Sequence, residues 1–178
     1  MGRPVPAAAT ASPGNFVTGA LWNSQVKALN DFVTGVPVFV GYAAAAQSIP
    51  VGNVMTSLSL DTTTIDTDNG HSNVTNNSRY IAQVAGTYLI CGSAGFTSTS
   101  GGDRRIQIAL NGAAVIGSGA SMDPSQAVQH GLQTSTIVTM NGTTDYVEVQ
   151  AAQSTASALS TLASNVFCSG MRVAWIGR

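Results

Sequence analysis

SRYIAQVAGTYLICGSAGF, the sequence from Ser78 to Phe96, alternates larger apolar residues with small or polar ones on both sides of Gly86. Alternation over five or more residues, bounded by glycine, is typical of half-buried strands. We therefore expect a strand, a tight turn and a second strand, with the other apolar segments pairing with them or packing over them. The expected core residues are Tyr80, Tyr88 and Ile90, with Phe167 and Trp175 near the other end of the chain.

The chain after Pro37 repeats this pattern in short segments separated by turn residues. Asn111-Gly112 stands between two apolar segments and is a strong signal for a β-hairpin. Strands are expected at residues 38–42, 54–60, 80–84, 87–96, 104–110, 113–116, 132–140, 146–150 and 166–176, and loops at 61–77, 117–126 and 154–164. This spacing predicts an all-β fold, an antiparallel two-sheet jelly-roll sandwich, with an up-and-down barrel as the alternative.

Between residues 18 and 34 the spacing of the apolar residues is that of a helix and not of a strand. Four apolar residues recur there at helical spacing, namely Trp22, Val26, Leu29 and Val33. Thr18 is a suitable N-cap, and Gly35 and Pro37 end the predicted helix. A helix of this length is marginal alone, so the stripe must pack on something. It can pack on the chain's own β-domain, self-associate around an axis or dock on another protein, and one stripe does not decide between them.

Three parts of the chain follow from these patterns. Residues 1–15 are rich in Pro, Ala, Ser and Thr and cannot bury enough apolar surface to fold alone, which predicts an extended N-terminal arm. Residues 16–36 form the short amphipathic helix, for docking or trimerisation. Residues 37–178 form the jelly-roll head.

The composition is unusual in its lack of charge. Charged residues make up 8% of the chain, against roughly 25% in ordinary soluble domains. Lys27 is the only lysine and Glu148 the only glutamate. Either an assembly covers much of this surface, or the chain is a secreted β-protein with a hydroxyl-rich surface. The net charge of -1 gives no electrostatic case for nucleic acid or an anionic membrane, and Arg104-Arg105 is interpreted as a solvated strand end.

No apolar segment is long enough to span a bilayer, and the N-terminus lacks the continuous apolar core of a signal peptide. We expect a protein made in the cytoplasm and not exported by the usual route. Cys91 and Cys168 have no metal-motif spacing; they are expected to be buried inert thiols, with a single disulfide as the alternative if their strands are neighbours.

The residues with side chains capable of catalysis do not form an arrangement that predicts an enzyme. His71 and His130 are expected to be exposed loop residues, and no nucleophile elbow accompanies them. Asp145 and Glu148 fall on opposite faces of one strand, so they cannot converge as paired carboxylates. Weak calcium candidates are Asp61, Asp66 and Asp68, but the closing acid of a calcium loop is missing and Asx-turns are favoured. No cofactor is expected.

The β-region resembles the jelly roll shared by the globular head of complement first component and tumour necrosis factor. Matching features occur in the family's order: Gly86-Thr87-Tyr88-Leu89-Ile90, the strand Ile106 to Gly112, the pair Ser135–Met140 and Asn141–Val149, and Phe167-Cys168-Ser169-Gly170-Met171. They cover about residues 37–178. The resemblance implies a jelly roll that assembles as a homotrimer.

The segment before it, from Phe16 to Phe32 with its Trp22-Asn23 pair, is similar to the opening of small structural proteins of tailed phages that infect actinobacteria. This second resemblance implies a virion component, on capsid or tail.

Two functions are expected from these resemblances. The first is a trimeric structural protein displayed on a phage particle, such as a capsid decoration, head fibre or tail protein, docked through the arm and helix onto other virion proteins. The alternative is a module of the tail or fibre that binds a host receptor or surface glycan through loops 61–77, 97–103 and 117–130. A hydrolase is the third and weakest hypothesis. Neither nucleic acid nor membrane insertion is expected.

Overall fold

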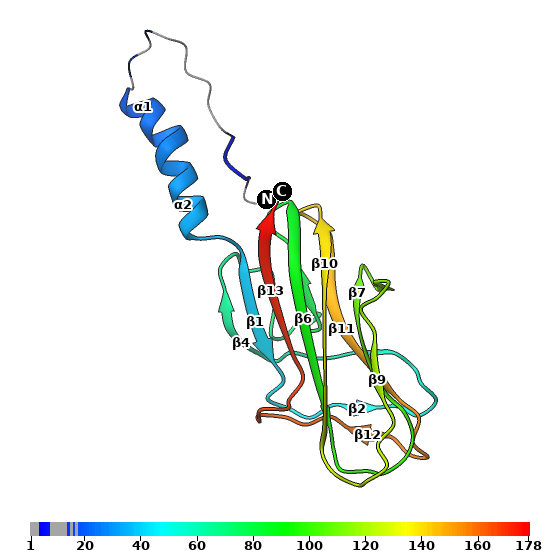
Figure 1. Cartoon of the computed structure of the whole chain (residues 1–178). Helices are drawn as coiled ribbons and strands as arrows, with labels where there is room; N and C mark the ends of the chain where they lie inside the picture. The colour runs from blue at the N-terminus through cyan, green and yellow to red at the C-terminus, as the bar shows by residue number, and fades with distance from the viewer. Residues whose placement is uncertain (1–3, 8–13, 15, 17) are drawn as a thin grey trace.

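The computed structural model describes residues 4–7, 14, 16 and 18–178. A two-layered β head runs from strand β1 (Val38–Tyr42) to β13 (Gly170–Gly177), and a helix projects from one end of it (Figure 1). The predicted extended arm, residues 1–15, lies mostly outside the described residues. Among the helices described, none has the length and apolar character needed to cross a membrane.

The helix begins where the sequence predicts. The Thr18 side chain accepts a hydrogen bond from the backbone N–H of Leu21, as an N-cap residue does. A first turn, α1 (Gly19–Leu21), leads into a π-helical segment, η1 (Trp22–Lys27), and then into α2 (Ala28–Thr34). Gly35 caps its C-terminal end. The π-helical segment is the one feature of the helix that the apolar spacing did not indicate.

Five strands form one sheet in the order β10-β6-β13-β1-β4. Their bounds are β10 His130–Met140, β6 Gly86–Phe96 and β4 Thr62–Asp66, with β1 and β13 as given above. All neighbours in this sheet are antiparallel. Because β13 lies between β6 and β1, neighbouring strands are distant in sequence, and the alternative of an up-and-down barrel is excluded.

The second sheet is built around β11 (Tyr146–Gln153) and β7 (Arg104–Leu110). Its shorter strands are β3 (Thr56–Ser57), β5 (Arg79–Ile81), β8 (Ala113–Ala114) and β9 (Ala120–Met122), and a separate pair is made by β2 (Ser48–Ile49) and β12 (Leu159–Ser160). The β7–β8 hairpin turns at Asn111 and Gly112 with φ of 53° and 81°, as the Asn-Gly pair predicts.

The core lies between the two sheets. Tyr80, Tyr88 and Ile90 are fully buried there, as predicted, and Trp175 is partly buried against the same cluster. The sheets approach each other closely at Gly92 of β6, where an added Cβ would lie 2.8 Å from a methyl of Val149 in β11. The close packing of the two sheets therefore explains why a glycine stands in the middle of this apolar strand.

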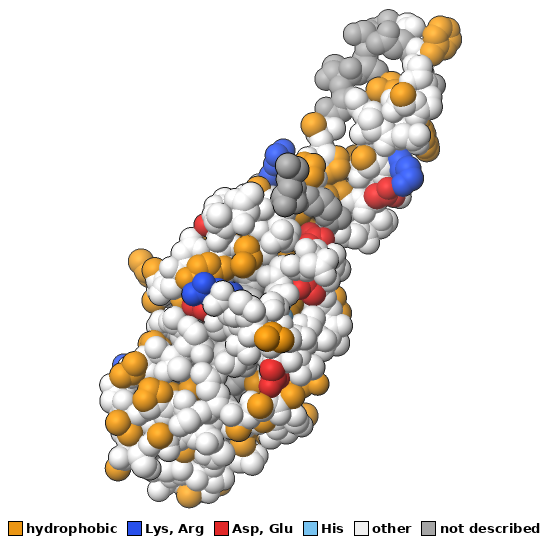
Figure 2. Space-filling view, turned by 180° about the vertical axis from the view of Figure 1, so that it is seen from behind, with side chains coloured by type: hydrophobic (Ala, Val, Ile, Leu, Met, Phe, Trp, Pro, Cys, Tyr) orange, Lys and Arg blue, Asp and Glu red, His pale blue; other side chains and the backbone are white. Residues whose placement is uncertain are grey.

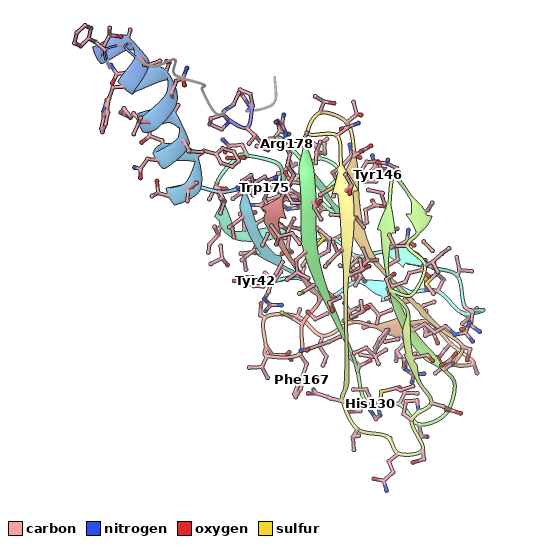
Figure 3. All side chains as sticks on the ribbon, turned by 45° about the horizontal axis from the view of Figure 1, so that its top comes forward. Tyr42, His130, Tyr146, Phe167, Trp175 and Arg178 are labelled. Carbon is pink, nitrogen blue, oxygen red and sulfur yellow. The ribbon has the colours of Figure 1, made fainter. Side chains whose placement is uncertain are left out.

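Phe167 was predicted to be a core residue, and this prediction is wrong. The last strand begins at Gly170, so Phe167 belongs to the loop before it and is 50% exposed. Its backbone lies over Gly95 of β6, where a Cβ would meet the Phe167 carbonyl oxygen at 2.0 Å. Phe167 thus covers the outer side of the five-stranded sheet, at the end away from the helix, and does not enter the core (Figure 3).

Several expected elements also differ. The strand expected at residues 54–60 is reduced to β3, and those expected at 80–84 and 113–116 are shortened to β5 and β8. The loops expected at 61–77, 117–126 and 154–164 contain β4, β9 and β12. In addition, β5 and β6 lie in different sheets, so the turn between them crosses from one layer to the other. Strand β4 consists of three threonines, one isoleucine and one aspartate and is half-exposed, so it lacks the apolar alternation that marks the other strands.

Candidate oligomer interface

The outer face of the five-stranded sheet carries an apolar row close to the helix. The register aligns Ile137 of β10, Leu89 of β6, Ala174 of β13 and Val38 of β1 across four neighbouring strands. These residues point away from the core, since their sequence neighbours Val138, Tyr88, Val173 and Phe39 point into it. Ile137 is 58% exposed. Large apolar side chains gathered on one exposed face are typical of a surface covered by a partner.

The next row of this face carries its one charge. Ser135, Cys91, Arg172 and Val40 are aligned across the same strands, and Ile65 of β4 extends the row. Arg172 is exposed and has no hydrogen bond or ion pair with any described residue. No other outward-facing residue of β10, β6, β13 or β1 in this part of the chain is charged. The face is therefore built from apolar and hydroxyl groups around a single guanidinium.

Two shallow hollows occupy this face, with volumes of about 540 and 440 Å³. Both are lined by Ser93, Gln133 and Arg172. The larger extends to Tyr42 and to the loop at 164–168, and the smaller to Cys91 and Ser135. Both hollows therefore lie beside the one charge of this face.

The other side of the molecule is different in character. Figure 2 shows that side chains coloured as charged occur there in isolated spots on a surface that is mostly neither charged nor hydrophobic. Hydrophobic side chains are scattered over the head and also occur on the projecting helix (Figure 2).

The predicted helix stripe is exposed in the single chain. Trp22, Val26, Leu29 and Val33 are 46–63% exposed. The adjacent row of the helix faces the chain itself: Phe32 is buried, with its ring 5.1 Å from that of Trp175 in an edge-on contact at the base of the helix (Figure 3). Packing of the stripe on the chain's own β-domain, one of the three expected arrangements, is therefore not what the structure has. A role in docking or trimer contacts stays a prediction.

The three weak calcium candidates do not form a site. The Asp61 carboxylate accepts hydrogen bonds from the backbone N–H groups of Ala44 and Ala45, and that of Asp66 accepts from Gly70 and His71. No group of three or more histidine, cysteine or acidic residues in the described ranges is placed to hold a metal ion. Asp61 and Asp66 instead fix loop backbone, which is the turn role that the sequence favoured.

The histidines differ from each other. His71 was expected to be exposed, but it is half-buried against Phe39, with its two ring nitrogens 2.7 and 2.9 Å from the carbonyl oxygens of Arg79 and Leu60. It joins the start of β5 to the segment before β4. His130 begins β10 at the end of the head away from the helix (Figure 3). The structure does not bring the two histidines together.

The cysteines are both free and partly buried. Cys91 lines the smaller hollow and Cys168 the larger one. Neither is the fully buried residue expected, because both lie on the outer side of the five-stranded sheet and not in the core.

One charged residue, Arg104, has a role that the sequence did not indicate. Arg104, expected to be solvated, is fully buried and donates hydrogen bonds to the carbonyl oxygens of Thr99, Gly101 and Gly102. Burial lowers the pKa of its guanidinium, while Asp123 and Asp103 act in the opposite direction. Arg104 therefore organises the loop 97–103. The signal available in the sequence was its place at an inward position of an alternating strand.

The loops expected to bind a receptor are only partly brought together. The backbone N–H of Gly101 donates to the carbonyl of Pro124, which joins loop 97–103 to segment 117–130. Segment 61–77 lies elsewhere, because its strand β4 is at the opposite edge of the sheet from β10.

No protein-family model matches the sequence, and no match to a curated protein was found. Solved structures do match. The globular domain of zebrafish complement 1qA superposes with a TM-score of 0.56 and 9% identity, covering 80% of this chain and 98% of that one. Murine APRIL, solved at pH 5.0 and at pH 8.5, gives TM-scores of 0.54 and 0.53 with 10% and 11% identity, covering 78% of this chain and 98% of each.

These comparisons confirm the fold predicted from the resemblance. The chain has an antiparallel jelly-roll head of the kind found in complement 1qA and APRIL. At this level of identity the likeness establishes the fold alone.

Proposed function

We propose that this protein is a non-enzymatic structural component of a tailed-phage particle and that it works as a homotrimer. The observation that carries the proposal is the outer face of the five-stranded sheet, which is hollowed, largely apolar and has Arg172 as its one charge. Covering this face with further copies of the chain accounts for an exposed apolar row on a protein with only 8% charged residues. The virion role is supported by the resemblance of residues 16–32 to phage structural proteins.

The helix and the arm are proposed to dock the trimer on other virion proteins. The helix projects from one end of the head, so its exposed stripe can reach a partner without displacing a strand (Figure 1). Phe32 anchors the helix to the head through Trp175.

Sedimentation velocity tests the assembly. We expect the wild-type chain, of 18.1 kDa, to sediment at three times its own mass. Ile137→Asp and Leu89→Asp each place a carboxylate in the apolar row, and we expect each to weaken the trimer by about 100-fold, since a buried unpaired charge is destabilising by several kcal/mol. Val54→Asp is the matched control, because Val54 is similarly exposed but lies beside β3 in the other sheet. A monomeric wild-type chain at micromolar concentration overturns the proposal.

Deletion of residues 1–35 tests the docking. Loss of incorporation into particles by a head that still forms trimers supports docking through the arm and helix. Particles that incorporate the truncated head normally contradict it.

A second function rests on a different observation. Loop 97–103 and segment 117–130 meet at the end of the head away from the helix, so a trimer docked through its helix presents them outward. This arrangement favours binding of a host receptor or surface glycan. A truncated head that binds host cells and blocks infection supports it, and one that does neither counts against it.

A further inference from the structure

The ring of His71 lies between two backbone carbonyl groups. Its Nδ1 atom is 2.7 Å from the carbonyl oxygen of Arg79, and its Nε2 atom is 2.9 Å from that of Leu60. Both distances are those of N–H···O hydrogen bonds, and a carbonyl oxygen can only accept. Each ring nitrogen therefore faces a group that requires a hydrogen on that nitrogen.

A neutral imidazole cannot satisfy both carbonyl groups. In either tautomer one ring nitrogen carries a hydrogen and the other a lone pair, so one carbonyl oxygen would face a lone pair. Only the imidazolium has an N–H group on both nitrogens. We propose that the folded head holds His71 as an imidazolium, and that this proton fixes the segment 67–78 between β4 and β5, which loosens when the proton is lost. This inference goes beyond the proposed function and does not depend on it.

The surroundings of the ring suit a positive charge. The Asp66 carboxylate accepts hydrogen bonds from the backbone N–H groups of Gly70 and His71, at 3.0 and 2.9 Å, so a negative charge lies close to the histidine. The ring of Phe39, which is fully buried, has its centroid 4.8 Å from that of the His71 ring. An opposite charge nearby and an aromatic ring within about 6 Å both favour a cation.

The other charged groups around the ring do not oppose its charge. Arg79 is the only Lys or Arg of β1, β4, β5 and segment 67–78, and its guanidinium is paired with the Glu148 carboxylate at 3.1 Å. The remaining ionisable groups of these elements and of the segment before β4 are two carboxylates and a phenol, namely Asp61, Asp68 and Tyr80. None of these three adds a positive charge.

The proton matters for the backbone on both sides of the ring. The Ile81 N–H donates to the Gly70 carbonyl and the Leu60 N–H to the Asn77 carbonyl, both at 2.8 Å. Loss of the proton replaces one of the two ring hydrogen bonds by a repulsion between lone pairs, so these two amides should open more often.

The direction of the pH dependence follows from linkage. The folded chain holds the proton of His71 more tightly than the unfolded chain does, because only the folded chain supplies both acceptors. The contribution of His71 to stability is therefore present in acid and is lost as the pH rises above about 6.5, where an ordinary histidine gives up its proton.

Nitrogen NMR of the full chain, labelled at histidine, detects the proton directly. At about pH 7.5 we expect His71 to carry hydrogen on both ring nitrogens and His130 to carry it on one. His130 is the internal control: among the described residues only its Nε2 atom has a partner, the Gln126 carbonyl oxygen at 3.2 Å, which a neutral ring satisfies. The variant His130→Gln assigns the two sets of signals.

Amide hydrogen exchange measures the effect on the segment. After correction for the intrinsic effect of pH on exchange, we expect the amides of Ile81 and Leu60 to lose about tenfold in protection between about pH 6 and about pH 8.5. The amide of Val115, which donates to the Ile108 carbonyl in the other sheet, is the control and should not change. In His71→Gln the protection of Ile81 and Leu60 should be low and free of this pH step.

The outcomes are distinct from those of the assembly tests. Two N–H groups on His71 at a pH where His130 has one, with a pH step in protection that is absent from His71→Gln, support the inference. A neutral His71 ring in the folded chain at that pH, or protection of Ile81 that does not vary with pH, overturns it. If His71→Gln does not fold, the two measurements on the wild-type chain decide. Neither measurement depends on the number of copies in the assembly, so a monomeric chain contradicts the proposed function and leaves this inference standing.

Discussion

Glu148, the only glutamate of the chain, is buried in the outer side of the second sheet. Its carboxylate accepts hydrogen bonds from the hydroxyls of Ser57 and Ser78 and from the guanidinium of Arg79, at 3.2, 2.7 and 3.1 Å. Arg79 also lies over the ring of Tyr146, 4.1 Å from its centroid. One carboxylate thus joins β3, β5 and β11.

We expect Glu148→Ala to lower the free energy of unfolding by about 2 kcal/mol, because it leaves Arg79 and two hydroxyls without their acceptor. Since Arg79 is partly exposed, solvent limits the loss. Glu148→Gln keeps an acceptor oxygen and should lose about half as much. Urea unfolding measures both, and equal stability of the alanine variant and the wild type would contradict the role.

Gly92 and Val149 give a paired test of how closely the sheets pack. We expect Gly92→Ala to destabilise the head by about 1–3 kcal/mol, because the new methyl would meet a Val149 methyl at 2.8 Å. Adding Val149→Ala removes that methyl and should recover most of the loss. Thermal unfolding of the two single variants and the double variant measures the coupling, and purely additive effects would show that the contact is unimportant.

An aromatic contact between Phe32 and Trp175 anchors the helix to the head, whereas the stripe of Trp22, Val26, Leu29 and Val33 is exposed. We expect Phe32→Ala to release the helix from Trp175 and to raise amide exchange over residues 19–34 by about tenfold. The melting temperature of the head should change little. Leu29→Ser is the control, since Leu29 lies on the exposed stripe; exchange rates that rise equally in both variants would argue against the anchor.

The elements that the sequence predicts well are those with strong local signals. Residues 104–110, Asn111-Gly112 and the Thr18 cap are found where their patterns place them. Strand β4 was missed because its threonines read as a polar loop, and Phe167 was misplaced because an apolar loop looks like the start of a strand.

The candidate interface could not be predicted from local sequence patterns, for a different reason. Cys91, Arg172 and Ser135 are far apart in sequence and become neighbours only through the order β10-β6-β13. The resemblance to known jelly rolls predicted a trimer, but which face is hollowed and apolar depends on this register.

The proposed trimer has almost no charge at its contact, and this fixes how it should respond to salt. We expect its dissociation constant to change less than about twofold between low and high sodium chloride, because screening acts on charges and only Arg172 is present on the face. Sedimentation equilibrium across a salt series measures it. A trimer that dissociates as salt rises would show that ion pairs hold the contact.

The connection between the two sheets at residues 82–85 affects how the protein unfolds. Ala82 and Val84 are fully buried, and the Tyr88 hydroxyl donates to the Val84 carbonyl at 2.5 Å. This short span connects the two layers at the end of the sheets near the helix, and the two layers share one core, so we expect neither layer to stay folded without the other. Calorimetry should accordingly record one transition, and the slowest-exchanging amides of both sheets should share a single opening free energy.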